Sequence, residues 1–253
     1  MITKKIWQEP LLWAAGALGI VALATGLVLV QQVAGGDVQS PVPPLPISED
    51  HQDFRYFLRA DATPFQEELF DGLIAAREAF EAGSTPASES AYAQALVKNF
   101  IADFFTWSNK LGRSDVGGLQ FIDSRVRSGV RSLAVDEFYL YLNQYIQTFG
   151  NQELLEVERV IIDSVELDAL WELDIELPEP ELDGFGNEIE PEEPVETYLE
   201  VIRVVAHWEY APAGILAYGD FQREAVFYLQ RGNGFLSIYA MLELPQEEGE
   251  LDV

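Results

Sequence analysis

The hydrophobic residues of this chain follow three successive patterns, and each pattern predicts a different kind of element. Residues 11–30 form a run of twenty residues without a charged side chain. Between residues 64 and 149 the apolar residues recur at the spacing of helical turns, and from residue 165 they alternate with polar ones. These patterns predict one membrane-spanning helix, then several amphipathic helices, then β-strands.

The length of the first run favours a membrane anchor. At about 1.5 Å per residue, a helix over residues 11–30 spans roughly the 30 Å hydrocarbon core. Lys4 and Lys5 precede the run, so the positive-inside rule predicts a cytoplasmic tail over residues 1–10 and export of the remaining chain. A cleaved signal peptide is the alternative, but its apolar region is usually only about 7–15 residues long.

One face of the expected spanning helix carries small residues at spacings of four, three and four. These residues are Ala15, Gly19, Ala22 and Gly26. Small residues on one face let a second helix approach closely, which predicts a surface for self-association or for contact with other membrane subunits. Small residues are also frequent in spanning helices that do not associate, and this alternative remains open.

The residues after the run divide into a linker, a folded domain and a tail. Proline and glycine are frequent in residues 31–48, which predicts a semi-extended linker. Residues 49–245 carry the helical and alternating patterns and predict one extracytoplasmic α+β domain. Residues 246–253 are acidic and predict a loose tail.

Helices are expected in the first half of the domain. Thr63 and Gln66 have the spacing of a capping box around Pro64, so the first helix is expected to begin there and to stop before Gly83. Helical periodicity predicts three further helices, over residues 91–108, 119–133 and 136–149. Asp136 and Tyr139 are interpreted as capping and packing residues, with a pocket lining as the alternative.

The helix over residues 91–108 has a wide apolar face and a polar face. The apolar face contains Leu96, Val97, Phe100, Ile101, Phe104, Phe105 and Trp107. The polar positions, which we expect to face solvent, are Lys98, Asn99, Asp103 and Thr106. In the next helix we expect the arginines to pair with the chain's own carboxylates rather than form an anion site; they are Arg125, Arg127 and Arg131.

Strict alternation then predicts strands. Apolar residues occupy every odd position from Val165 to Leu177, and acidic residues fill five of the six positions between them. We expect a half-buried strand whose odd positions pack against the helix of Phe100 and Phe104. Three more strands are predicted over residues 198–210, 221–231 and 235–244, with a tight hairpin between the last two. The expected fold is therefore helices packed on a curved antiparallel sheet of about four strands.

An acidic, proline-rich insertion separates the first two of these strands. Residues 178–194 predict a charged hairpin arm or loop with Phe185 and Ile189 exposed near its tip, where they suit docking to a partner. A calcium site on its carboxylates is the alternative. The spacing does not match an EF-hand loop, so the arm is favoured.

Composition excludes several functions. The chain has 15 basic and 43 acidic residues, a net charge of −28, which argues against direct binding to nucleic acid. It has no cysteine, which excludes disulfides and thiol chemistry. His51 and His207 are its histidines, and alternation places His207 on the solvent face of its strand. We find no catalytic, cofactor or metal motif, so we expect neither an enzyme nor a cofactor.

One family resembles this chain in its order of elements. The resemblance rests on that order and on three segments: LVKNFIADFFTWSNK, DEFYLYLNQYIQTFG and RGNGFLSIYAMLEL. The chain resembles the VirB-eight type of bitopic inner-membrane scaffold in type IV secretion and conjugation systems. That resemblance implies a nuclear-transport-factor-two-like fold and a single-pass protein that assembles in the cell envelope.

The same fold class also hosts other functions. A membrane-tethered pocket enzyme or small-ligand binder is the first alternative, and an accessory subunit of a larger membrane complex is the second. The character of the interior separates them, because an enclosed cavity with an ionisable group favours an enzyme, whereas a space filled by aromatic side chains favours a scaffold.

Overall fold

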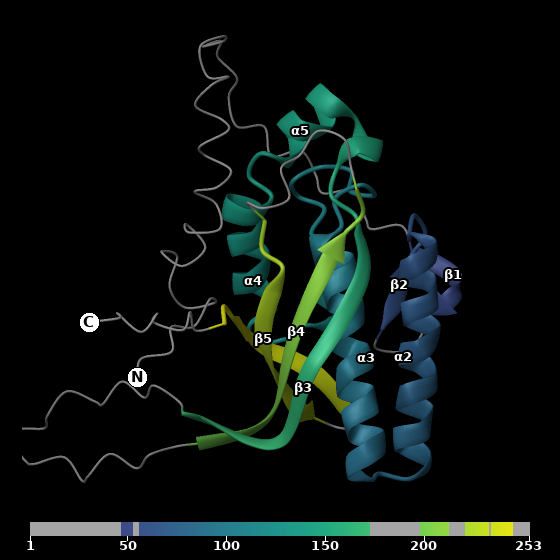
Figure 1. Ribbon diagram of the computed structural model, residues 1–253, viewed down its shortest axis with the longest axis vertical. Helices are drawn as coiled ribbons and strands as arrows, with labels where there is room; N and C mark the ends of the chain where they lie inside the picture. Colours follow the sequence, from purple (N-terminus) through teal and green to yellow (C-terminus); the bar gives the residue numbers. More distant parts are fainter. Residues whose placement is uncertain (1–46, 53–55, 173–197, 213–220, 233, 245–253) are drawn as a thin grey trace, which may run out of the picture.

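A computed structural model describes most of the domain, and it confirms the α+β prediction. The described residues are 47–52, 56–172, 198–212, 221–232 and 234–244. Helices precede a four-stranded antiparallel sheet and lie against one of its faces (Figure 1). Among the described helices, none has both the length and the apolar composition that a bilayer crossing requires. The expected spanning run at 11–30 lies outside the described residues.

Two long helices form an antiparallel pair at the start of the domain. Helix α2 (Pro64–Ala82) begins at the predicted capping box, where Thr63 accepts from the backbone N–H of Gln66 and Gln66 accepts from that of Thr63. Helix α3 (Pro86–Phe105) starts five residues earlier than predicted. Its cap is a second box, in which the backbone N–H of Ser88 donates to the hydroxyl of Thr85.

The next helices are shorter than predicted. Residues 119–133, predicted as one helix, contain a 3₁₀ turn (Leu119–Phe121) and helix α4 (Arg127–Leu133). In place of the helix predicted over residues 136–149, the chain forms a π-helical turn (Ala134–Phe138) and helix α5 (Leu142–Phe149). A helical period constrains which side chains face inward, but it does not exclude tighter or wider turns that keep the same side chains buried.

A short two-stranded sheet lies beside α2. The residues that form it show no clear periodicity in the sequence. Strand β1 (Ile47–Gln52) pairs antiparallel with strand β2 (Phe57–Arg59). Figure 1 shows this pair on the side of the molecule that α2 occupies. Strand β2 carries Arg59 into the interior, where only 2% of the residue is exposed.

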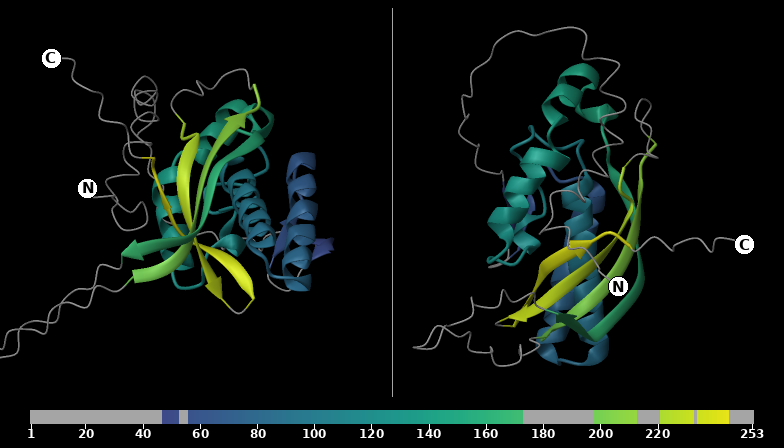
Figure 2. Two further views of the ribbon diagram at one scale, coloured as in Figure 1. Left: turned by 60° about the horizontal axis from the view of Figure 1, so that its bottom comes forward. Right: turned by 90° about the vertical axis from the view of Figure 1, so that its left-hand side faces the viewer.

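The main sheet is an antiparallel meander of four strands. Its order is β3 (Val157–Glu172), β4 (Tyr198–Tyr210), β5 (Glu224–Gly232) and β6 (Phe235–Leu242). Strands β5 and β6 close as the predicted hairpin, with Gly232 paired to Phe235 and Gly234 at a φ of 80°. The views in Figure 2 show β3 and β4 bending along their length so that one end of the ribbon leaves the body of the domain.

Three register shifts along β3 explain much of this bend. Between Glu166 and Ala169, three steps along β3 match only two steps along β4, because the partners are Arg203 and Val201. The other two shifts lie at 157–159 and 162–164, and each also leaves one extra residue on β3. Extra residues of this kind are β-bulges, which bend a strand and increase its twist.

The last bulge corrects the prediction for Trp171. Val165 pairs with Val204, whose other neighbour Phe227 contacts the ring of Phe100 in α3, so this face lies against the helices. Beyond the bulge, Ala169 pairs with Val201, three residues from Val204 and therefore on the opposite face. The prediction that the odd positions pack against the helices is therefore wrong beyond the bulge.

Trp171 is still buried, as the alternation indicated, but on the other face. It is 6% exposed, and its ring lies 4.3 Å from that of Tyr228, centroid to centroid. Tyr228 pairs with Arg203, which shares the face of Val201. Strict alternation of hydrophobic residues therefore identified the buried positions but not the side of the sheet on which they are buried.

Replacement of Trp171 tests this packing. We expect Trp171→Ala to lower the free energy of unfolding by about 3–5 kcal/mol, because it removes a large buried aromatic side chain. Glu166→Ala is the control; its side chain is 61% exposed on the same strand, and we expect less than about 0.5 kcal/mol. Denaturant unfolding of a fragment from residue 47 onward measures both. Equal losses would contradict the described burial.

Candidate functional site

The space between the helices and the concave sheet is the natural place for a site in this fold, and aromatic side chains occupy it. The rings of Phe104 and Phe105 lie 5.0 Å apart, and each also contacts Phe138 at 5.0–5.2 Å. Phe105 extends the cluster to Trp208 on β4, at 4.3 Å between centroids. Trp107, Tyr139 and Phe221 continue the same ring contacts.

Polar side chains in α3 and at its C-cap, which were expected in solvent, are instead buried. Asn99, Asp103 and Thr106 are 4%, 7% and 0% exposed. Asn99 donates to the carbonyl oxygen of Leu69, which joins α3 to α2, and Thr106 accepts from the N–H of Val157 at the start of β3. The prediction of a solvated polar face was therefore wrong for these three residues, because other elements cover that side of α3.

Asp103 belongs to a buried cluster of charged groups. Lys110 is 0% exposed and donates from Nζ to Asp103 Oδ1 at 3.0 Å. The other carboxylate oxygen of Asp103 accepts from the N–H of Gly118 at 2.7 Å and from the amide of Gln120 at 3.2 Å. Asp103 therefore joins α3 to the loop that follows it through two separate segments of that loop.

A second ion pair lies beside the first. Arg59 on β2 makes a bidentate pair with Asp115, in which Nη2 and Oδ2 are 2.9 Å apart, and it also binds Asp61. Asp115 accepts in addition from the N–H of Leu111. Planar pairs of this kind are the strong form of the arginine and carboxylate contact. The pair attaches the short β1–β2 sheet to the loop after α3.

Two glycines allow the loop to approach Asp103. At Gly117 a Cβ atom would lie 2.2 Å from the backbone oxygen of Asp103, a distance that real side chains do not tolerate. Gly118 has a φ of +73°, and a Cβ there would lie 2.8 Å from the ring of Phe100. The hydrogen bond from Gly118 to Asp103 thus depends on the absence of both side chains.

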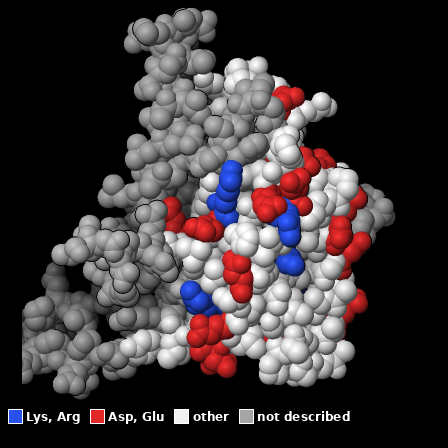
Figure 3. Space-filling view, in the orientation of Figure 1, with Lys and Arg blue, Asp and Glu red and all other residues white. Residues whose placement is uncertain are grey.

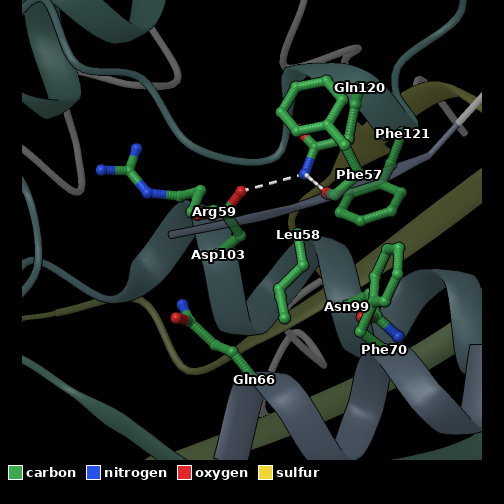
Figure 4. A pocket seen from close by; sticks show the side chains of 9 residues that line it. All are labelled: Phe57, Leu58, Arg59, Gln66, Phe70, Asn99, Asp103, Gln120 and Phe121. Atoms are coloured by element: carbon green, nitrogen blue, oxygen red, sulfur yellow. Dashed lines mark hydrogen bonds between the residues drawn. The ribbon is translucent and has the colours of Figure 1, made fainter. Parts of the chain in front are cut away.

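The cavity beside this cluster is small. Figure 4 shows its lining, with Gln120 between the carboxylate of Asp103 and the backbone oxygen of Phe57. Its volume is about 10 Å³, close to the minimum for one water molecule. A substrate does not fit in such a space, since ligand pockets usually measure about 300–1,000 Å³.

The cations of the cluster stabilise the ionised carboxylates, whereas burial lowers the pKa of Lys110 despite its contact with Asp103. Burial would raise the pKa of Asp103, but Lys110 and Arg59 outweigh burial and hold this pKa below its ordinary value. Burial also opposes the ionised form of Asp115, and the hydrogen bond from Arg59 lowers its pKa. The pKa of Arg59 is raised, because its bonds to Asp115 and Asp61 overcome the effect of burial. Both carboxylates are therefore ionised at neutral pH, as partners of cations.

The structure places several of the predicted residues away from this cluster. Tyr139 is fully buried and donates its hydroxyl hydrogen to the backbone oxygen of Phe104, so its packing interpretation is confirmed. Asp136 is exposed and lies within the π-helical turn, so its predicted capping role was wrong. His207 is 40% exposed and lies 2.9 Å from Asp163, on the face away from the helices as predicted.

The arginines of the α4 region follow the prediction in part. Arg125 binds Asp123 with both Nε and Nη2, as expected for pairing with the chain's own carboxylates. Arg127 donates instead to the backbone oxygen of Ile122. The proposed contact residues of the span and the acidic arm lie outside the described residues; they are Ala15, Gly19, Ala22, Gly26, Phe185 and Ile189.

Compared with models of protein families, with curated proteins and with solved structures, the chain has no match. Within the described ranges, no three histidine or acidic side chains lie close enough together to hold a metal ion. The suggested calcium site at 178–194 lies outside those ranges. The sequence did not predict that these charged residues lie together. It identified Asp103 only as a polar position expected to face solvent.

The Arg59 pair can be tested by removing one partner. Arg59→Met leaves the carboxylate of Asp115 buried without its cation, and we expect a loss of about 3–5 kcal/mol in the free energy of unfolding. The double variant Arg59→Met with Asp115→Leu should recover part of this loss, because it also removes the stranded charge. Arg125→Met is the control, since Arg125 is 58% exposed, and should cost less than about 1 kcal/mol.

Stability at low pH tests the lowered pKa values. A carboxylate with a lowered pKa in the folded state contributes full stability above its unfolded pKa of about 3.9 and loses it as the pH falls through the folded value. We therefore expect wild-type stability to fall below about pH 4. Asp115→Asn should be less stable at pH 6 and lose less on acidification, as measured by urea unfolding at each pH. Parallel pH curves would contradict the assignment.

Proposed function

We propose that this chain is a non-enzymatic, membrane-anchored scaffold or assembly subunit of an envelope complex, with its α+β domain outside the cytoplasm. A role in type IV secretion or conjugation is the sharpest form of this proposal, and it includes a nuclear-transport-factor-two-like fold. The meander β3–β4–β5–β6 with helices on its concave face supports that fold. The membrane anchor is supported by the uncharged run at 11–30.

The filled interior is the observation that carries the proposal. In a pocket enzyme, a catalytic acid or base faces a space that the substrate enters. Here the corresponding space contains packed rings, and the cavity beside the charged cluster measures about 10 Å³. Asp103, Asp115, Arg59 and Lys110 each bind an oppositely charged partner inside the protein. These groups suit a rigid domain that presents its outer surface to other proteins.

Assembly through the span is tested with the full-length protein in mild detergent. Gly19→Leu combined with Gly26→Leu should reduce the size of the complex, because larger side chains keep neighbouring helices apart. The matched control is Leu18→Ile combined with Leu27→Ile, which keeps side-chain volume on other faces of the helix. Oligomer size by light scattering and mass spectrometry of co-purified subunits are the measurements. Wild-type size and composition in both variants would overturn the proposed role of this face.

A further inference from the structure

Two exposed apolar side chains lie at the end of the β3–β4 ribbon that leaves the body of the domain. Leu170 is 67% exposed and Tyr198 is 47% exposed. Leu170 pairs with Glu200, which lies two residues from Tyr198 on β4, so the side chains of Leu170 and Tyr198 share one face of the ribbon. On neighbouring antiparallel strands, diagonal positions of this kind lie about 7–8 Å apart, within reach of large side chains. The two residues therefore form one apolar patch.

Leu170 breaks the sequence pattern of its strand. The neighbouring even positions Glu166, Asp168 and Glu172 are acidic, and Leu170 stands where the alternation would place another carboxylate. The bulge between Glu166 and Ala169 turns Leu170 to the helix side of the sheet. Arg231 binds both Glu89, in the first turn of α3, and the backbone oxygen of Leu167, so Leu167 lies beside the start of this helix. Leu170 is three residues further along β3 and therefore lies past the start of α3.

Carboxylates surround this patch in excess of cations. Arg231 pairs with Glu89 at 2.6 Å, with Glu200 at 3.0 Å and with Asp168 at 3.8 Å. One guanidinium thus faces three carboxylates. Asp168 is 87% exposed and Glu200 is 63% exposed, so both can accept a further cation from outside. Figure 3 shows the opposite face of the sheet, which points away from the helices, and acidic side chains outnumber basic ones there as well.

An apolar hollow continues from the same arginine. It is lined by Phe80 at the end of α2, by Phe235 and Leu236 of β6, and by Arg231, and its volume is about 270 Å³. Arg231 therefore lies between the hollow and the carboxylates of the ribbon. The hollow is large enough for side chains of a partner but smaller than the usual range of ligand pockets.

We propose that this surface, made by Leu170, Tyr198, the hollow and the carboxylates of Asp168 and Glu200, docks an amphipathic segment of another protein. The segment carries apolar side chains flanked by lysine or arginine. Its apolar side chains contact Leu170 and the hollow, and its cations bind Asp168 and Glu200. This inference rests on the proposed assembly function and names the chemistry of the partner.

Charge complementarity selects this partner over a second copy of the same surface. A twofold contact would bring Asp168 and Glu200 of each copy together, and like charges across an interface repel one another. A cationic segment instead gains from the unbalanced carboxylates around Arg231. The apolar patch supplies contact area, and the charges set the orientation and the choice of partner.

Site-specific photo-crosslinking in the full-length protein, in membranes of its own host, tests the proposal. The photoreactive residue p-benzoylphenylalanine replaces Leu170, and in a matched control it replaces Leu111, which is 63% exposed elsewhere on the domain. We expect a crosslink to another protein from position 170 and none to that protein from position 111. Mass spectrometry identifies the crosslinked peptide, which should contain apolar residues next to lysine or arginine.

Charge reversal then tests the chemistry. Asp168→Lys combined with Glu200→Lys should reduce the crosslink about tenfold, whereas Glu209→Lys, at a side chain 50% exposed on the other face of β4, should not. An absent crosslink, a crosslink to a second copy, an acidic crosslinked peptide or a crosslink unaffected by charge reversal would each overturn the inference. If position 170 crosslinks nothing while subunits still co-purify with the chain, this inference fails and the assembly function stands.

Discussion

The pairing of buried charges holds the first half of this domain in place. Arg59 and Asp115 attach the β1–β2 sheet to the loop after α3, and Asp103 holds both Lys110 and Gly118 of that loop. Removing charged groups from water is costly, and their attraction offsets that cost only when the geometry is good and the remaining oxygens accept hydrogen bonds. Asp103 and Asp115 meet this condition through backbone N–H donors. The cluster thus joins β2, α3 and the loop after α3 through directional contacts.

Local signals in the sequence identified much of the fold. The box at Thr63 and Gln66 located the start of α2 because its hydrogen bonds are made within four residues. The hairpin at Gly232 and the alternation in β4 were equally local, since turn geometry and strand pleat fix both. The start of α3 was missed although Thr85 and Ser88 form a similar box, because serine at the last position is a weaker signal than glutamine.

Features that depend on distant parts of the chain could not be predicted in this way. The pattern predicts solvated side chains at Asn99 and Asp103, because their partners lie outside α3, on α2 and in residues 110–120, and helical periodicity does not report contacts with other segments. Arg59 gave no signal beyond being a basic residue among aromatic ones. The change of face at Trp171 depends on one extra residue of β3 relative to β4. The sequence of one strand does not show how it is paired with its neighbour.

The bulges of β3 also affect how its edge can pair with another strand. Among the described strands, β3 is an edge of the sheet, and sixteen residues of regular edge would offer a long template for a strand from another molecule. Each bulge interrupts the hydrogen-bond spacing that such a strand needs, and the intervening stretches are too short for stable addition. Copies can therefore lie at high local concentration without their sheets pairing edge to edge. Contacts between neighbours are left to side-chain surfaces, which can be reversible and selective in a way that continuous sheet extension is not.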